Sequence, residues 1–250
     1  MKRALRQIQK DWDTLGREDP LWAILTDDSK RGGQWNSEEF FATGRTEIAL
    51  ALESLTALGV TVRRGRALDF GCGVGRLTQA LAEHFARVDG VDVAPSMIAR
   101  ARQWDSSDGR CQFILNESED LRPLQNNHYD FIYSAITLQH IERPLIRGYL
   151  RAMIRKLAPG GVLLFQLPSE PATRPKGWKK VKVLLPSALL RIIDVWRHGA
   201  QARMQMHGLG REEVETLLRE GGCRVAGVTP DGSAGATWIG YRYCAVKEPC

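Results

Sequence analysis

From residue 66 onward, short apolar runs alternate with stretches in which apolar residues recur at helical spacing. The strand-like runs cover residues 66–70, 87–93, 111–115, 129–135 and 161–167, and the helical patterns cover 76–85, 95–104 and 144–157. Strands that alternate with helices form a mostly parallel sheet covered on both faces, and such strands are apolar throughout instead of alternating in polarity. The pattern therefore predicts a doubly wound α/β domain.

Three segments lie outside this alternation. Residues 1–65 are mostly helical in pattern, and residues 168–207 interrupt the sheet with several prolines and a basic, aromatic tract. Residues 208–250 contain a helical pattern followed by two further strand-like runs, which would complete a sheet of seven strands. We therefore divide the chain into an N-terminal helical region (1–65), an α/β core (66–167), an insertion (168–207) and a C-terminal part of the sheet (208–250).

The composition is that of an ordinary folded protein, with 43% hydrophobic and 26% charged residues. No apolar run reaches the roughly 20 residues that cross a bilayer. Residues 1–13 lack the apolar stretch of a secretory signal, so we expect a cytoplasmic location. The five cysteines are scattered and form no C-x-x-C pair, which predicts reduced thiols and no metal site. The net charge of +6 permits an anionic partner, but Lys and Arg are spread along the whole chain, so we expect no nucleic acid partner.

The stretch ALDFGCGVGRLT, residues 67–78, follows the first predicted strand and places three glycines on alternate positions behind Asp69. In a doubly wound sheet, ligands bind beyond the carboxyl ends of the strands, where a tight turn needs residues without a Cβ. A dinucleotide-binding fingerprint would have its third glycine at the position of Arg76. The spacing D-x-G-x-G-x-G instead predicts a cofactor site of another kind, and a tight turn without a ligand is the alternative.

This spacing resembles motif I of the class I S-adenosylmethionine-dependent methyltransferases. Further stretches resemble later motifs of the family in the same order, at residues 90–102, 113–121, 129–141 and 155–166. The resemblance implies a Rossmann-like methyltransferase fold with S-adenosylmethionine as cofactor, an N-terminal helical lid at 1–65 and an acceptor-side cap at 168–207. A noncatalytic S-adenosylmethionine-binding module and an NAD-dependent oxidoreductase are the alternatives.

The resemblance also implies which residues bind the cofactor. Asp69 would help to hold the ammonium group of the ligand, commonly through water, and Asp92, about twenty residues after the loop, would accept hydrogen bonds from the ribose hydroxyls. Glu117 would contact the adenine amino group, while the backbone N–H of Ser118 would meet a ring nitrogen. Many family members have Asp and Ala at these two positions, so this chain departs from the pattern there. The expected set is completed by Gly71, Cys72, Gly73, Met97 and Ala135.

Three residues outside these contacts are candidates for binding or catalysis. Arg45, in the predicted lid, could hold the methionine carboxylate in a bidentate fork, or it could pair with Glu47 or Glu38. His140 follows the fourth predicted strand, and its imidazole titrates near neutrality, so it could act as a base or hold the loop by hydrogen bonding. His207 could face the same cleft from the insertion, or it could mark the start of the last helix.

Two features bear on the methyl acceptor. Enzymes that methylate planar amines of nucleic acids commonly carry an N/D-P-P-Y loop after the fourth strand, and this chain has SAIT there. Residues 170–207 combine a basic rim with an apolar helical stretch, which suits an amphiphilic or anionic substrate or a membrane surface; the alternative is a helix packed on its own domain beside solvated lysines. We expect a small-molecule acceptor, such as a sugar, a lipid-linked glycan or a secondary-metabolite hydroxyl, while an RNA substrate stays open on charge alone and no oligomeric state is predicted. The basic rim comprises Lys176, Lys179, Lys180 and Lys182.

Overall fold

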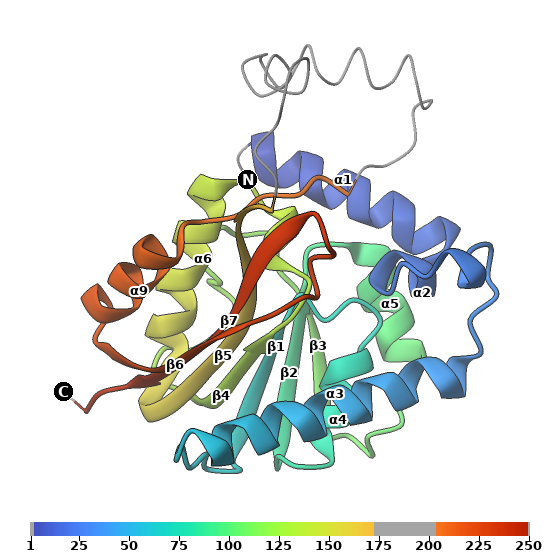
Figure 1. Ribbon diagram of the computed structural model, residues 1–250. Helices are drawn as coiled ribbons and strands as arrows, with labels where there is room; N and C mark the ends of the chain where they lie inside the picture. The colour runs from blue at the N-terminus through green and yellow to red at the C-terminus, as the bar shows by residue number, and fades with distance from the viewer. Residues whose placement is uncertain (1–2, 173–203, 250) are drawn as a thin grey trace, which may run out of the picture.

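The computed structural model describes residues 3–172 and 204–249, and its centre is a seven-stranded sheet in the order β3-β2-β1-β4-β5-β7-β6 (Figure 1). The strands are β1 (Arg66–Phe70), β2 (Arg87–Asp92), β3 (Cys111–Leu115), β4 (Tyr129–Ser134), β5 (Leu157–Pro171), β6 (Cys223–Pro230) and β7 (Trp238–Lys247). β1 to β5 run parallel, whereas β7 lies antiparallel between β5 and β6. The predicted doubly wound, mostly parallel sheet is confirmed. The strand order reverses between β1 and β4, so the carboxyl ends of these two strands are the expected ligand site.

Helices cover both faces of the sheet. α3 (Ser37–Ala57) and α4 (Arg76–Ala82) pack on one face, and α6 (Arg143–Lys156) and α9 (Arg211–Glu220) pack on the other. α5 (Pro95–Gln103) lies against β2 and β3. This double cover explains why the central strands carry buried apolar side chains on both of their faces.

The N-terminal helices lie at one end of the sheet. α1 (Arg3–Glu18) runs across the top of the sheet in Figure 1 and contacts both α5 and the short α2 (Pro20–Ile24). The apolar residues of α1 recur at helical spacing and face the rest of the molecule; they are Leu5, Ile8, Trp12 and Leu15. Two single-turn helices, η1 (Asp28–Lys30) and η2 (Leu138–His140), are also present. Every helix among the described residues is too short or too polar to cross a membrane.

Successive residues of the central strands contribute to different sides of the core. In β4, Phe131 packs with the helices α3 and α4, whereas Ile132 packs with α6. The same alternation holds for Leu163 and Leu164 of β5. Each such side chain is fully buried, and burial of a large apolar side chain stabilises the fold by about 1.5–3 kcal/mol. The two-sided burial therefore fixes the register of the strands at the ligand end.

The fifth strand extends beyond the boundary that the sequence predicts. β5 continues to Pro171, four residues past the predicted end of the core at 167, because it stays paired with β7. Pro168 lacks an N–H, but pairing with β4 has already ended at Phe165, so no β4 carbonyl loses a partner. On that side the Pro168 carbonyl accepts the N–H of Leu209 at 3.1 Å. Most of the predicted cap, residues 173–203 with its basic rim, lies outside the described residues.

Candidate cofactor and acceptor site

A cavity with about 940 Å³ of empty space, partly open to solvent, lies at the carboxyl ends of β1, β2 and β4. Its floor is the glycine loop between β1 and α4, and α1 and α2 form the opposite wall. Six of the residues that the sequence assigns to the cofactor line this cavity; they are Gly71, Cys72, Gly73, Asp92, Met97 and Ala135. The switch point of the sheet thus carries a pocket of the size that small ligands occupy.

The glycine loop needs residues without side chains. Gly71 has a φ of +81°, and a Cβ there would lie 2.1 Å from Cγ2 of Thr137. A Cβ on Gly73 would lie 2.6 Å from Cδ1 of Ile24. The N–H groups of Gly71 and Cys72 both donate to the carbonyl of Val91, which ties the loop to the end of β2. Bare backbone therefore faces the cavity at this point.

Asp92 ends β2 and holds the glycine loop by its carboxylate. One oxygen accepts the N–H of Gly73 at 2.9 Å, and the other accepts the N–H of Ala94 at 2.8 Å. Burial raises the pKa of Asp92, and these backbone hydrogen bonds oppose that rise. Each carboxylate oxygen has a second lone pair, so the group can still accept hydrogen bonds from a ligand in the cavity.

Asp69 lies beneath the glycine loop and does not line the cavity. Its side chain is fully buried and accepts a hydrogen bond from the Thr78 hydroxyl at 2.7 Å. Burial raises the pKa of Asp69 to about 7, against the lowering effect of the Thr78 hydrogen bond. The structure thus gives Asp69 a position behind the loop, where any influence on a ligand would be indirect.

At the end of β3, the cavity is lined by Asn116 and not by Glu117. Glu117 is exposed and accepts a hydrogen bond from Gln9 of α1 at 3.2 Å. The N–H of Ser118 donates to the Asn116 side chain at 3.3 Å. The sequence analysis missed Asn116; its signal was a polar residue directly after an apolar strand, at the edge where ligands bind.

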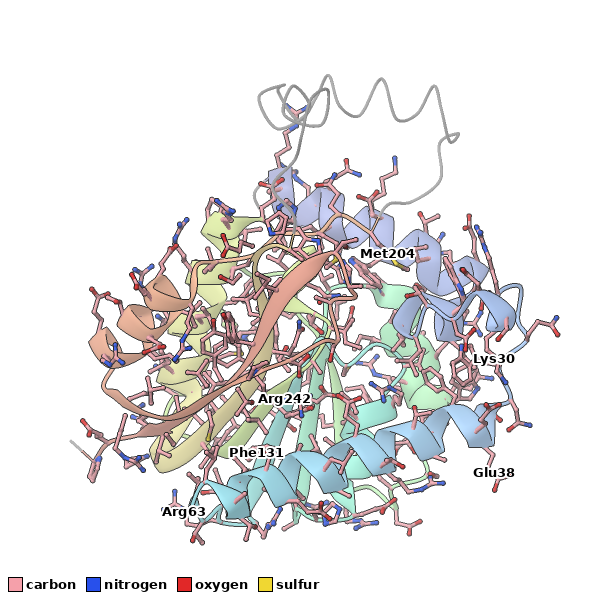
Figure 2. The ribbon with its side chains drawn as sticks, viewed as in Figure 1. Lys30, Glu38, Arg63, Phe131, Met204 and Arg242 are labelled. Atoms are coloured by element: carbon pink, nitrogen blue, oxygen red, sulfur yellow. The ribbon has the colours of Figure 1, made fainter. Side chains whose placement is uncertain are left out.

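The guanidinium group at the cavity belongs to Arg76 and not to Arg45. Arg45 is exposed on α3 and lines a separate hollow beside Trp104. Its expected ion-pair partner Glu47 pairs with Arg76 instead, at 2.8 Å, and Glu38 points away from the molecule (Figure 2). The Arg76 side chain is only 4% exposed, and its Nε has no hydrogen-bond partner among the described residues.

His140 lines the cavity from η2. Its ring packs edge-on against Trp12 of α1, with ring centroids 5.1 Å apart. Nδ1 lies 2.9 Å from the carbonyl oxygen of Gln205, and Nε2 lies 3.2 Å from the amide nitrogen of Gln139. Burial lowers the pKa of His140 to about 4, so the imidazole is neutral at pH 7.

His207 is near this site but does not line the cavity. Its N–H donates to the carbonyl of Gln139 at 2.7 Å, and burial lowers the pKa of its side chain. α9 begins four residues later, at Arg211, so His207 does not start that helix. Met204, at the beginning of the same segment, lies beside α1 in Figure 2 and belongs to an apolar cluster that includes Trp12 and Leu15 of that helix. Residues 204–209 therefore tie His140 and α1 to the rest of the chain.

Helices over the site are predicted from the sequence, but no residue of α1 or α2 is predicted to line it. α1 contributes Leu5, Ile8 and Trp12 to the cavity wall, and α2 contributes Ala23 and Ile24. The apolar side of α1, read at helical spacing, was the available signal. Among the described residues, no group of three His, Cys, Asp or Glu side chains could hold a metal ion.

Comparisons with known proteins agree with this architecture. Residues 67–161 match the family described as "Methyltransferase domain". The chain is 28% identical over 197 residues to the ubiquinone biosynthesis O-methyltransferase of Xanthomonas campestris pv. campestris, an alignment that covers 76% of this chain and 80% of the relative. It is 38% identical over 108 residues to the trans-aconitate 2-methyltransferase of Streptomyces avermitilis, which covers 41% of this chain and only 39% of that relative.

A solved structure supports the fold along nearly the whole chain. The magnesium protoporphyrin IX methyltransferase of Synechocystis PCC 6803 with bound SAH aligns with a TM-score of 0.63 at 17% identity, covering 98% of this chain and 100% of the other. At this identity the likeness concerns the fold. Residues 67–161 thus form a methyltransferase domain with the fold of the class I S-adenosylmethionine-dependent methyltransferases, whose cofactor is S-adenosylmethionine.

Proposed function

We propose that this methyltransferase transfers the methyl group to a hydroxyl of a small molecule, such as a sugar, a lipid-linked glycan or a secondary metabolite. The observation that carries the proposal is one cavity that is lined by the glycine loop and Asp92 and also by His140. The name of the ubiquinone biosynthesis relative, an O-methyltransferase, supports a hydroxyl acceptor. The α1 wall is apolar, which suits an acceptor with an apolar part.

The residues of the cavity fit the parts of S-adenosylmethionine. The bare backbone at Gly71 and Gly73, which both line the cavity, would lie against the methionine part and the ribose. Asp92 would accept hydrogen bonds from the ribose hydroxyls with its remaining lone pairs. The unpartnered Nε of Arg76 would donate to the methionine carboxylate, the contact that the sequence analysis assigned to Arg45.

Three expected contacts need water or a small rearrangement. Asp69 would act on the ammonium group through water, since it lies behind the loop. Glu117 would contact the adenine amino group after exchanging its hydrogen bond with Gln9. The N–H of Ser118 would likewise exchange its bond with Asn116 for one with the adenine ring.

Bound S-adenosylmethionine would supply an electrophilic methyl group on a positively charged sulfur. The chain would then mainly align the acceptor oxygen with that methyl group and exclude water, and alignment of this kind lowers a barrier by about 7–11 kcal/mol. The apolar wall formed by Leu5, Ile8 and Trp12 keeps water from the reacting side of the cavity.

His140 would hold the acceptor hydroxyl and receive its proton. A neutral imidazole whose pKa is about 4 takes few protons from a free hydroxyl, but its Nε2 would accept a hydrogen bond from one once the Gln139 amide nitrogen, 3.2 Å away, moves aside. The hydroxyl becomes strongly acidic as its oxygen bonds to the methyl group, and a weak base is then sufficient. The products are the methyl ether, S-adenosylhomocysteine and one proton, which passes from His140 to water. His207, one hydrogen bond away from Gln139, would support the loop and would not touch the acceptor.

Calorimetric titration with S-adenosylmethionine, S-adenosylhomocysteine and NAD tests the cofactor, and methyl transfer to a panel of hydroxyl compounds tests the acceptor. We expect binding of the first two ligands and a methyl ether as the product. Binding of NAD alone would overturn the cofactor assignment. A product methylated on nitrogen or carbon would overturn the hydroxyl proposal.

A second candidate is a noncatalytic S-adenosylmethionine-binding module, and the observation that favours it is that both ring nitrogens of His140 already have partners. This candidate predicts tight cofactor binding with no turnover of any acceptor. An RNA substrate would show itself by binding that weakens steeply as the salt concentration rises.

A further inference from the structure

A chain of hydrogen bonds links the backbone N–H of Ile136 to the backbone carbonyl of Gln205 through three side chains. We call these groups the amide chain. Ile136 N–H lies 3.2 Å from Oε1 of Gln166, and Nε2 of Gln166 lies 3.3 Å from Oε1 of Gln139. Nε2 of Gln139 lies 3.2 Å from Nε2 of His140, and Nδ1 of His140 lies 2.9 Å from the Gln205 oxygen. Both glutamines are buried, with exposures of 1% and 4%, so water does not replace their partners.

The two ends of the amide chain fix the direction of every hydrogen bond in it. A backbone N–H can only donate, so the Gln166 oxygen faces Ile136 and its nitrogen must donate to Gln139. Gln139 in turn donates to Nε2 of His140. A backbone carbonyl can only accept, so Nδ1 of His140 carries the proton that faces Gln205. The geometry is satisfied only by a neutral imidazole with the proton on Nδ1 and an unprotonated Nε2, whose single lone pair accepts the Gln139 N–H.

We propose that Gln139 and Gln166 are positioning residues that hold His140 in the neutral form with its proton on Nδ1. Protonation of Nε2 would require Gln139 to turn its oxygen toward the ring. Gln166 would then have to turn as well, and its amide nitrogen would face the N–H of Ile136, donor against donor. Through the side chains of Gln166 and Gln139, the amide chain therefore disfavours protonation of Nε2. Burial of His140 disfavours the charged ring as well.

The other groups packed around His140 add little to this opposition, because His207 lowers the pKa of His140 less than burial does and the Gln205 carbonyl raises it. Trp12 of α1 presents an uncharged ring, and the segment 204–209 contributes His207, whose pKa is itself lowered by burial. Glu142 and Arg143, at the start of α6, act on His207 with opposite signs. The electrostatic effect on His140 from titratable groups comes from His207 and is smaller than that of burial.

The amide chain has a consequence for methyl transfer that rests on the proposed function. A proton received from the acceptor would put two donors face to face at Ile136, next to Ala135 in the cavity wall. His140 would therefore keep the proton only briefly and release it to water, which returns the side chain to the accepting form for the next turnover.

Nitrogen NMR of the protein labelled with ¹⁵N-histidine tests the amide chain without cofactor or acceptor, so its outcome is independent of the proposed function. His140→Gln identifies the His140 signals. We expect a protonated Nδ1 and an unprotonated Nε2 at pH 7. In Gln166→Met, which is similar in size but breaks the amide chain, we expect the pKa of His140 to rise by about one unit. Once turnover is measured, the acid limb of its pH profile should move in the same direction.

Gln79→Met is the matched control, because Gln79 also makes hydrogen bonds, to Trp104 and Ser106, but lies outside the amide chain. It should leave the His140 signals unchanged. A proton on Nε2 in the wild-type protein would overturn the proposal, and that measurement does not depend on whether any variant folds. An unchanged His140 pKa in folded Gln166→Met would overturn it as well. Absence of methyl transfer beside the expected NMR signals would count against the proposed function alone.

Discussion

The two halves of the cavity are built from contacts of very different range along the chain. In the cofactor half, the glycine loop is held by Asp92, 19 residues from Gly73. In the acceptor half, His140 is held by Gln205, 65 residues away, and by Trp12 of the first helix. The hydrogen bonds that hold the glycine loop therefore lie within one short stretch, whereas the contacts that hold His140 form only when the whole chain has folded.

The largest expected effect comes from Gly71→Ala, which breaks the cofactor half where it touches the acceptor half. The new Cβ would meet Thr137 in the loop after β4, and the φ of +81° disfavours any L residue. We expect the free energy of unfolding to fall by about 2–4 kcal/mol, with loss of S-adenosylhomocysteine binding. Urea unfolding and calorimetry measure the two effects.

Gly109→Ala separates the cost of an alanine at positive φ from the cost of its contact with a neighbouring side chain. Gly109 also has a positive φ, +75°, but nothing lies within 4 Å of an added Cβ. This variant should lose only about 1 kcal/mol and should bind the ligand normally. Equal losses of stability in the two variants would show that the contact of the new Cβ with Thr137 does not contribute to the loss in Gly71→Ala.

Asp92→Ala tests whether the carboxylate serves a ligand as well as the loop. The affinity for S-adenosylhomocysteine should fall by about 1.5–3 kcal/mol, measured by calorimetry. Asp130→Ala is the matched control, because Asp130 also accepts two hydrogen bonds, from Arg63 and from the N–H of Arg66, in a region distant from the cavity. If both variants bound the ligand as the wild type does, the ribose assignment for Asp92 would be lost.

Arg76→Met and Arg45→Met decide between the two candidate guanidinium groups. We expect Arg76→Met to weaken S-adenosylhomocysteine binding by about 1–2 kcal/mol, because it removes a donor to the carboxylate. Binding of 5′-methylthioadenosine, which lacks that carboxylate, should not change, and Arg45→Met should affect neither ligand. The opposite result, with only Arg45→Met impaired, would restore the sequence-based assignment.

The last expected effect is a pH dependence that arises at His140. The pKa of His140 is about 4 in the folded protein against an ordinary value of 6.5, so between these values the unfolded chain binds a proton that the folded protein does not. The free energy of unfolding should therefore fall by up to about 3 kcal/mol as the pH is lowered from 6.5 toward 4. Comparison of urea unfolding for the wild type and His140→Gln isolates this part.

Asp69 changes stability in the opposite direction but does not disturb the comparison. Its pKa is about 7 in the folded protein against 3.8, so its contribution to stability is present below pH 3.8 and is lost as the pH rises through 7. Because Asp69 is the same in both proteins, its effect cancels in the difference. Parallel pH curves for the wild type and His140→Gln would contradict the expected role of the buried imidazole.

The sequence predicted the fold well because buried strands and helical spacing are local signals. β1 and β3 have the bounds that the pattern predicts, and the glycine loop lies at the expected end of the sheet. The extension of β5 to Pro171 was missed because proline usually ends a strand, and only the pairing with β7 shows that its N–H is not needed there.

The parts of the cavity that helices contribute were less predictable because they depend on which side of each helix faces the cavity. The sequence pattern of α3 does not show which side of the helix faces the cavity. Only the packing of α3 on α4 shows that Arg76, and not Arg45, lines it. Gln166 was not predicted as part of the site, although its position in the sequence was a signal for it. A glutamine inside an apolar strand needs a buried partner, and the search for that partner leads to Gln139 and His140.

The end of β5 also has a consequence for how copies of this chain behave toward one another. Past Phe165 the strand has no β4 neighbour, and an open strand edge invites pairing with a second molecule. Here Pro168 has no N–H to donate at that edge, and the N–H of Leu209 donates to its carbonyl. The pairing with β7 also changes register between Pro168 and Glu170. The segment that positions His140 therefore also protects the sheet against edge-to-edge aggregation.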